Sequence, residues 1–488
     1  MSETRIGELC SALVAAAFEE LTSDRVIPMW SDAPRLQADI DFDAVRIRSR
    51  SEYTALKDEL LQSFPALFDD LDDYFKSFTV QQYIDTFLEE VLYQCGYADD
   101  FSPTGAPVKE VMDELERVLT GAPGDFVVAR LVSHLTTESG ASIELEGIRV
   151  IPDQVGSASN IVIRRQIPDS AHVLQRRPSV KGLRPRSLLV LRQTLDTPGF
   201  HTGRELSRKL DHFILIASLL TNGTAQPVYE VTGMSTAVTQ VPARLRELMN
   251  DGSITVARRV IRLNDAHGPA LDALSALVRS ADPGHEGKIH TSFGLALKKF
   301  GGFDHTTDAF EQLVDLATAL EGVMVGTNEG EGLTLRLCTR VSALLAADDD
   351  SARGIFGDVK ALYGLRSTIV HGGELTEKAL RKTLASVSTT SDTSNDVKLT
   401  VNLGYAIDRL RDIVRRAILA RLCLATGPDP IPHWPLGDKP TAVDAILSDD
   451  SSREVWRSYW RTHLAEIGVG EAANRATAVE YALSRSER

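Results

Sequence analysis

The chain has few cysteines, no long apolar run and less positive than negative charge. Its longest apolar run, Phe213–Leu220, is far shorter than the roughly 18 residues of a membrane span, so we expect no membrane segment. The amino-terminal segment is amphipathic and carries Glu3 and Glu8 where a signal peptide would carry basic residues. We therefore predict a cytoplasmic protein.

The four cysteines are far apart, which excludes a C-x-x-C metal motif. Each stands among apolar neighbours in a helical pattern, which favours reduced core residues over disulfides. They are Cys10, Cys95, Cys338 and Cys423.

The chain holds 53 basic and 68 acidic residues, a net charge of −15. Such an excess argues against general binding of polyanions, because a negative envelope repels phosphate at long range. Local basic patches can still bind phosphate at contact distance.

At 488 residues, 43% hydrophobic and 25% charged, the sequence is typical of a soluble globular protein of about three domains. We expect a mainly α-helical protein with a mixed α/β middle domain. The boundaries we predict are 1–122, 123–300, 301–426 and 427–488. The first unit is acidic, and amphipathic patterns predict helices at 5–22, 81–95 and 107–119.

In the middle domain the apolar period changes to short runs of Val, Ile and Leu, which favour strands. We predict one helix there, at 203–220. Strands are predicted at 126–132, 143–151, 161–167, 188–194, 227–232 and 254–262, with their topology left open.

A basic loop, residues 160–192, contrasts with the rest of the chain because it holds eight basic residues and one acid, Asp169. Such a loop could bind a phosphate backbone or a nucleotide. A solvated loop that pairs with the acidic amino-terminal domain is favoured, because no aromatic residue is present for base stacking. The candidate nucleic-acid-binding residues are Arg164, Arg165, Arg176, Arg177, Lys181, Arg184 and Arg186, with Arg192 completing the basic set.

Residues 301–426 carry the most regular helical spacing in the chain and predict a four-helix bundle. The first helix runs through Phe310 and Met324 and the second covers about 331–346. The turn 348–351 supplies capping side chains for the third helix, which Gly372 and Gly373 end. A Ser/Thr-rich loop then leads to a fourth helix at about 400–425.

The third helix contains the strongest chemical signal. Arg366 lies within its apolar stripe of Ile355, Val359, Leu362, Ile369 and Val370. A guanidinium in that position is costly unless a partner meets it. His371 closes the helix in a row with Tyr363 and Ser367, which are eight and four residues earlier.

The tail, residues 427–488, begins with a Pro-rich connector and continues as a helix. Trp456, Tyr459, Trp460 and Leu464 share one face of it, and Arg453, Arg457 and Arg461 form an adjacent row. The pattern is typical of a helix that docks by its aromatic side, and RNA contact through the arginines is the alternative.

The segment Tyr363-Gly-Leu-Arg-Ser-Thr-Ile-Val-His-Gly-Gly373 resembles the Arg-x4-6-His signature of the HEPN superfamily, and more narrowly its Apea-like branch. Glu321 on the first bundle helix is similar to an acidic residue of that branch. The resemblance covers residues 301–426.

This resemblance implies a metal-independent endoribonuclease of antiphage defence or toxin type. Its two bundles would pair as a homodimer or higher even oligomer, and a phage-derived trigger could activate it. Arg366 would hold the scissile phosphate of an RNA substrate and His371 would transfer protons. Glu321, Tyr363 and Ser367 would support them, although many active members of the superfamily have Asn, Asp or His in place of Ser367.

Other interpretations stay open at this point. Arg366 could pair with Glu321 inside the bundle, and His371 could cap the last carbonyls of its helix. A catalytically silent HEPN module for dimerisation or ligand binding is the alternative function. We expect no cofactor and no metal site, because His285, His290 and His305 lack metal-ligand spacing.

Overall fold

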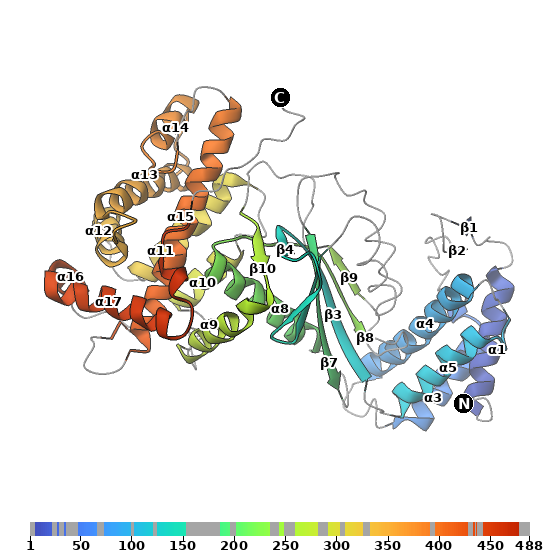
Figure 1. Cartoon of the computed structure of the whole chain (residues 1–488). Coiled ribbons are helices and arrows are strands. Elements are labelled where there is room, and N and C mark those ends of the chain that lie inside the picture. Colours follow the sequence, from blue (N-terminus) through green and yellow to red (C-terminus); the bar gives the residue numbers. More distant parts are fainter. Residues whose placement is uncertain are drawn as a thin grey trace.

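A computed structural model gives the fold of the chain and shows a mainly helical protein with a small antiparallel sheet in its middle region (Figure 1). Most of the basic loop, the strand expected at 161–167 and the prolines at 428–435 lie outside the described residues. The described residues are 5–21, 27–28, 34–35, 47–65, 73–98, 102–120, 124–152, 186–195, 202–234, 244–247, 259–281, 291–302, 308–325, 332–390, 396–427, 433–434, 436 and 443–477.

The amino-terminal unit is helical, as the sequence predicts, and has its own hydrophobic core. It contains one helix, α3, that the apolar spacing did not indicate. Leu13, Leu56, Phe87 and Leu115 are buried together in this core. The elements are α1 (Arg5–Leu21), β1 (Ile27–Pro28), β2 (Pro34–Arg35), α3 (Ser51–Ser63), α4 (Asp73–Ala98) and α5 (Ala106–Leu119).

The middle region forms a six-stranded antiparallel sheet in the order β5-β6-β7-β3-β8-β9. Val128 of the central strand β3 lies opposite Leu191 on one side and Thr232 on the other. A separate parallel pair joins β4 to β10. The strands are β3 (Gly124–Ser133), β4 (Leu135–Thr137), β5 (Ile143–Leu145), β6 (Ile148–Pro152), β7 (Arg186–Leu195), β8 (Gln226–Met234), β9 (Arg244–Glu247) and β10 (Ile261–Leu263).

The single strand predicted at 143–151 is wrong, because this segment is a hairpin. Glu146 and Gly147 have φ of 51° and 72° and form the two-residue loop between β5 and β6. Two consecutive left-handed residues match the twist of antiparallel strands, and glycine adopts this conformation without strain.

The sheet and the helices after it share one hydrophobic core. Helix α8 (Thr202–Thr221) packs on β3 and β7. Helices α9 (Gly268–Ser280) and α10 (Ser292–Gly302), which were not predicted, both contact α15 of the bundle. The boundaries expected near 300 and 426 therefore do not separate independent cores.

The four helices predicted for residues 301–426 are present and pack against one another. Asp308 caps the first by accepting hydrogen bonds from the amides of Phe310 and Glu311, and Ser351 caps the third through the amide of Gly354. A short helix, α14 (Glu377–Leu384), was not predicted. The four are α11 (Ala309–Met324), α12 (Leu333–Leu345), α13 (Ala352–Val370) and α15 (Asp396–Ala425).

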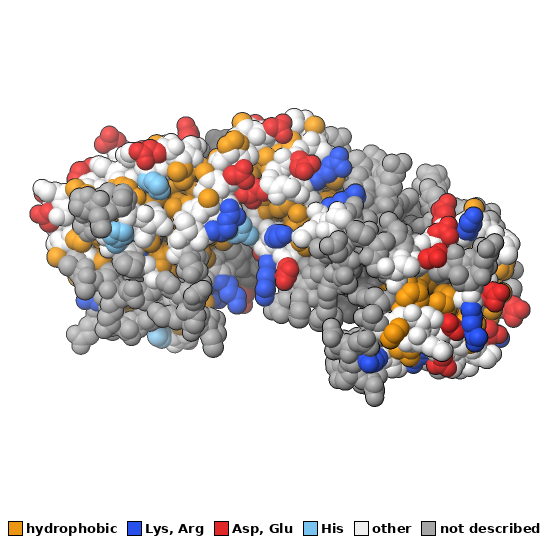
Figure 2. All heavy atoms as spheres, turned by 90° about the horizontal axis from the view of Figure 1, so that it is seen from below, with side chains coloured by type: hydrophobic (Ala, Val, Ile, Leu, Met, Phe, Trp, Pro, Cys, Tyr) orange, Lys and Arg blue, Asp and Glu red, His pale blue; other side chains and the backbone are white. Residues whose placement is uncertain are grey.

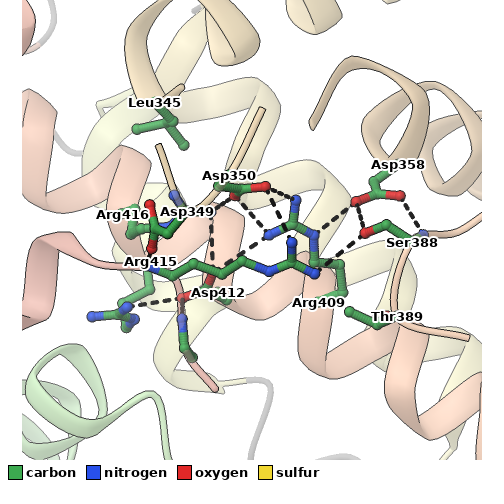
Figure 3. A network of polar contacts seen from close by, with 12 residues as sticks. Leu345, Asp349, Asp350, Asp358, Ser388, Thr389, Arg409, Asp412, Arg415 and Arg416 are labelled. Atoms are coloured by element: carbon green, nitrogen blue, oxygen red, sulfur yellow. Dashed lines mark hydrogen bonds and ion pairs between the residues drawn. The ribbon is translucent and has the colours of Figure 1, made fainter. Parts of the chain in front are cut away.

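Helix α15 buries a network of arginines and aspartates, drawn in Figure 3. Arg409 donates to the two oxygens of Asp350 at 2.9 and 2.8 Å and to Asp358 at 2.8 Å. Arg416 donates to Asp350 at 2.5 Å. Asp412 accepts from Arg415 at 2.8 Å. The network joins α15 to the start of α13.

Other arginines cap the carbonyl ends of the bundle helices. Arg340 and Arg421 donate to the carbonyls of Met324 and Val323 at the end of α11, each at 2.9 Å. Arg461 donates to the carbonyls that end α12, at 3.0 and 2.9 Å. A cation at a helix carboxyl end satisfies free carbonyls and complements the helix dipole.

The carboxy-terminal helix α17 (Asp450–Glu466), which follows α16 (Val443–Ser448), docks on the bundle. Trp456, Trp460 and Leu464 are fully buried, which confirms the predicted aromatic contact. Arg457 donates to the carbonyl of Ala343 at 2.6 Å, and Arg461 is a helix cap. Both arginines are engaged within the protein, so the alternative of an RNA contact through them receives no support.

Charged and apolar side chains are interspersed on the face shown in Figure 2. Among the described residues, no helix is long and apolar enough to cross a membrane.

Candidate active site

Helix α13 leaves the core at its carboxyl end. Ile355, Val359 and Leu362 are fully buried, and Ile369 is only partly buried. Val370 is 48% exposed, so its predicted place in the core stripe is wrong. The last turn of α13 therefore lies at the surface.

The two glycines after the helix close it in a Schellman motif. Gly372 has φ of 68°, and its amide donates to the carbonyl of Ile369 at 3.2 Å. The Gly373 amide donates to the carbonyl of Thr368 at 2.9 Å. Glycine allows the left-handed turn that these two hydrogen bonds require.

This motif bears on the role of His371, which is the last residue before the left-handed turn. Its own amide donates to the carbonyl of Ser367 at 3.1 Å. Backbone amides thus donate to the carbonyls of Ser367, Thr368 and Ile369, so these three carbonyls do not require a side-chain cap. The His371 residue is exposed to solvent.

The structure brings three predicted site residues together: Glu321 of α11 with Tyr363 and Arg366 of α13. The Tyr363 hydroxyl donates to Oε2 of Glu321 at 2.8 Å. Nη2 of Arg366 lies 3.8 Å from the same oxygen, which is too far for a hydrogen bond. The Arg366 guanidinium also lies over the Tyr363 ring, 5.5 Å from its centroid.

The Arg366–Glu321 pair is therefore loose and partly exposed. The two side chains are 19% and 28% exposed, and solvent screens such pairs strongly. Nε of Arg366 is buried and has no hydrogen-bond partner among the described residues. The expected contact between Arg366 and Glu321 within one chain is present, but it is not a fully buried ion pair.

The environment keeps Tyr363 protonated. Burial, followed by the hydrogen bond to Glu321, raises the pKa of the Tyr363 phenol above its ordinary value. Its hydroxyl is thus a stable donor at neutral pH. Cys338 of α12 lies near this phenol, and burial raises the pKa of its thiol to about 11, so a thiolate nucleophile is disfavoured.

Helices α10 and α11 pack closely at the residue after Glu321. A Cβ atom at this residue, Gly322, would lie 2.7 Å from the carbonyl oxygen of Ser292. Glycine at 322 therefore allows the start of α10 to approach the backbone of α11.

Arg366 and His371 do not converge within one chain. Five residues of α-helix rotate the chain by about 140° from the starting direction, and no contact joins the two side chains in the part of the chain that the structure describes. The predicted row of Tyr363, Ser367 and His371 passes from buried through half-buried to exposed. Among these residues the Ser367 hydroxyl forms no hydrogen bond to the His371 ring, and the two residues are joined only through the backbone.

The basic loop adds little to the described site. Arg164, Arg165, Arg176, Arg177, Lys181 and Arg184 lie outside the described residues. Arg186 begins strand β7 opposite Ser133. Arg192, further along the same strand, is exposed.

The described residues form no candidate metal site. Within them, no three His, Cys, Asp or Glu side chains gather as a metal site would require. All four cysteines are buried and free, as the sequence predicts.

The buried arginines of α15 are the polar residues that sequence reasoning missed. The segment Arg409-Leu-Arg-Asp-Ile-Val-Arg-Arg416 lies in a helix that is buried on all sides. The sequence did contain a signal for these buried arginines. The helix is long, and it carries charged residues on its apolar faces as well as on its polar face.

No family model, curated protein or solved structure matches the chain.

Proposed function

We propose that the chain is a metal-independent endoribonuclease of HEPN type, with Arg366 and His371 as its reactive side chains. One observation carries the proposal. The end of α13 presents an arginine without a hydrogen-bonded carboxylate and an exposed histidine, and backbone amides already donate to the carbonyls of Ser367, Thr368 and Ile369.

In this proposal His371 takes the proton of a ribose 2′-hydroxyl, and the 2′-oxygen attacks the adjacent phosphorus. The bond from phosphorus to the 5′-oxygen breaks, and a protonated histidine supplies the proton that the leaving oxygen takes up. Arg366 offsets the charge that develops on the phosphate oxygens. The products are a 2′,3′-cyclic phosphate and a 5′-hydroxyl end.

A composite site in a homodimer would supply both histidines. Arg366 and His371 of one chain face different directions on α13, so an arginine of one copy can meet a histidine of the other. Leu335 of α12 is 64% exposed and Val370 of α13 is 48% exposed. Because α12 and α13 form a helical hairpin, these side chains lie at the same end of the pair, where they offer apolar contact to a second bundle.

We further propose that RNA cleavage serves antiphage defence or a toxin-like role, with a phage-derived trigger as the activating partner. The alternative is a catalytically silent HEPN module for dimerisation or ligand binding. The proximity of Glu321 favours this alternative, since a carboxylate in the same chain already offsets part of the Arg366 charge. Ser367 next to Arg366 also fits a silent module.

Incubation of the purified chain with end-labelled RNA in EDTA tests the proposal. We expect cleavage by the wild type and a loss of about 100-fold or more in Arg366→Ala and in His371→Ala. Arg353→Ala, an exposed position on the same helix, is the control and should cleave normally. Undiminished cleavage in either site variant would refute the assignment. RNA binding without cleavage by the wild type would favour the silent module.

A further inference from the structure

The carboxylate of Glu321 is shared unequally between two donors. Its Oε2 atom accepts a hydrogen bond of 2.8 Å from the Tyr363 hydroxyl, while Nη2 of Arg366 stays 3.8 Å away from the same atom. A carboxylate and a guanidinium normally pair at about 2.7–2.9 Å, often through two parallel hydrogen bonds. The tyrosine hydroxyl, and not Arg366, therefore holds the hydrogen-bonding position at Oε2.

The guanidinium is nevertheless well located. The Tyr363 ring lies below it at 5.5 Å, a distance at which a cation is attracted to the ring face. The Glu321 carboxylate, 3.8 Å from Nη2, offsets part of the positive charge of Arg366. The Tyr363 ring and the negative charge of Glu321 thus orient Arg366, and no carboxylate among the described residues accepts a hydrogen bond from its guanidinium.

We infer that Tyr363 is a positioning residue, which holds Glu321 away from direct pairing so that the Nη donors of Arg366 stay available to a phosphate. The inference rests on the proposed ribonuclease function for the identity of that phosphate, an RNA backbone group. Whether the Arg366 guanidinium is available for binding does not depend on whether the chain cleaves RNA.

The substitution Tyr363→Phe isolates this role, because it keeps the ring and removes only the hydroxyl. Glu321 is then free to pair directly with Arg366, and RNA must compete with that pair. For a partly exposed pair we expect KM to rise by about fivefold with a smaller change in kcat. Adding Glu321→Gln to this variant removes the competing charge and should return KM to near the wild-type value.

A matched control exists in the amino-terminal unit. The Tyr53 hydroxyl donates to Asp85 at 2.8 Å, and Asp85 also accepts from Arg48. Tyr53→Phe therefore removes the same kind of hydrogen bond far along the chain from α13, and it should leave KM unchanged.

A second measurement does not depend on RNA. Phenylglyoxal modifies arginines that are not paired, and mass spectrometry of the peptide containing Arg366 gives its rate. We expect modification of Arg366 to be about fivefold slower in Tyr363→Phe and to recover in Tyr363→Phe/Glu321→Gln. An unchanged rate in the single variant overturns the inference, whether or not the protein cleaves RNA. A slower rate together with a wild type that does not cleave RNA supports the positioning role and favours the silent module over the nuclease.

Discussion

Removal of Arg409 should strongly destabilise the body formed by the sheet and the bundle. Its side chain is 1% exposed and pairs with Asp350 and Asp358, which are equally buried. Arg409→Met preserves most of the side-chain volume and removes the charge. Two buried carboxylates then lose hydrogen bonds that no water replaces.

The size of the effect follows from what each aspartate retains. Asp350 keeps its hydrogen bond from Arg416 at 2.5 Å. Asp358 keeps two from Ser388, both at 2.7 Å. Loss of one partner from a buried ion pair costs about 3–5 kcal/mol, and these remaining donors favour the lower end, about 3 kcal/mol.

Urea denaturation followed by tryptophan fluorescence measures this cost. Trp434, Trp456 and Trp460 are fully buried in the same core as α15, so their emission reports the unfolding of this body. The control is Arg381→Met, which breaks an exposed pair with Glu377 one helical turn away and should cost at most about 0.5 kcal/mol. Equal, small costs in both variants would refute the reasoning and leave the apolar packing of α15 as the main source of its stability.

The same network should make the protein sensitive to acid. Burial opposes ionisation of Asp350, but the hydrogen bonds and charges of Arg409 and Arg416 outweigh it and lower the pKa of its carboxyl below the usual value. Its stabilising contribution is complete above the unfolded-state pKa of about 3.9 and is lost as pH falls through the lower folded-state pKa. Urea midpoints measured at pH 3 and 5 should differ more in the wild type than in Arg409→Met. For the helix end, Gly372→Ala should destabilise the chain by about 1 kcal/mol in the same assay, because φ is 68° there. Gly364→Ala, within α13 where an added Cβ atom would meet nothing within 4 Å, should be neutral or stabilising.

Local patterns predicted much of the helical framework. The three-and-four spacing of apolar residues located α11, α12 and α15, and the two glycines located the end of α13, because each of these signals lies within a few residues. Helix α14 was missed because it spans only Glu377–Leu384, and so short a helix depends on packing of its buried Leu380 and Leu384. The β5–β6 hairpin carried a readable signal in Glu146-Gly147.

The buried charges could not be predicted in the same way. Arg409 meets aspartates that are 59 and 51 residues earlier in the chain, and no local period encodes such a pairing. At the candidate site, the sequence indicated Glu321 and Arg366 but not the hydrogen bond from Tyr363 that separates them. That bond depends on the packing of α13 against α11, which brings together residues 42 positions apart in the chain.

The buried scaffold and the candidate site differ in how they hold their arginines. Arg409 is 1% exposed and forms three hydrogen bonds to carboxylates, so a ligand from solvent cannot reach its guanidinium. Arg366 is 19% exposed and approaches its carboxylate only to 3.8 Å. The two regions meet on α13, where Asp358 lies about 12 Å along the helix from Arg366. A folded Arg409→Met variant should therefore lose stability while Arg366 keeps its contacts with Tyr363 and Glu321, because those contacts depend on the packing of α11 against α13.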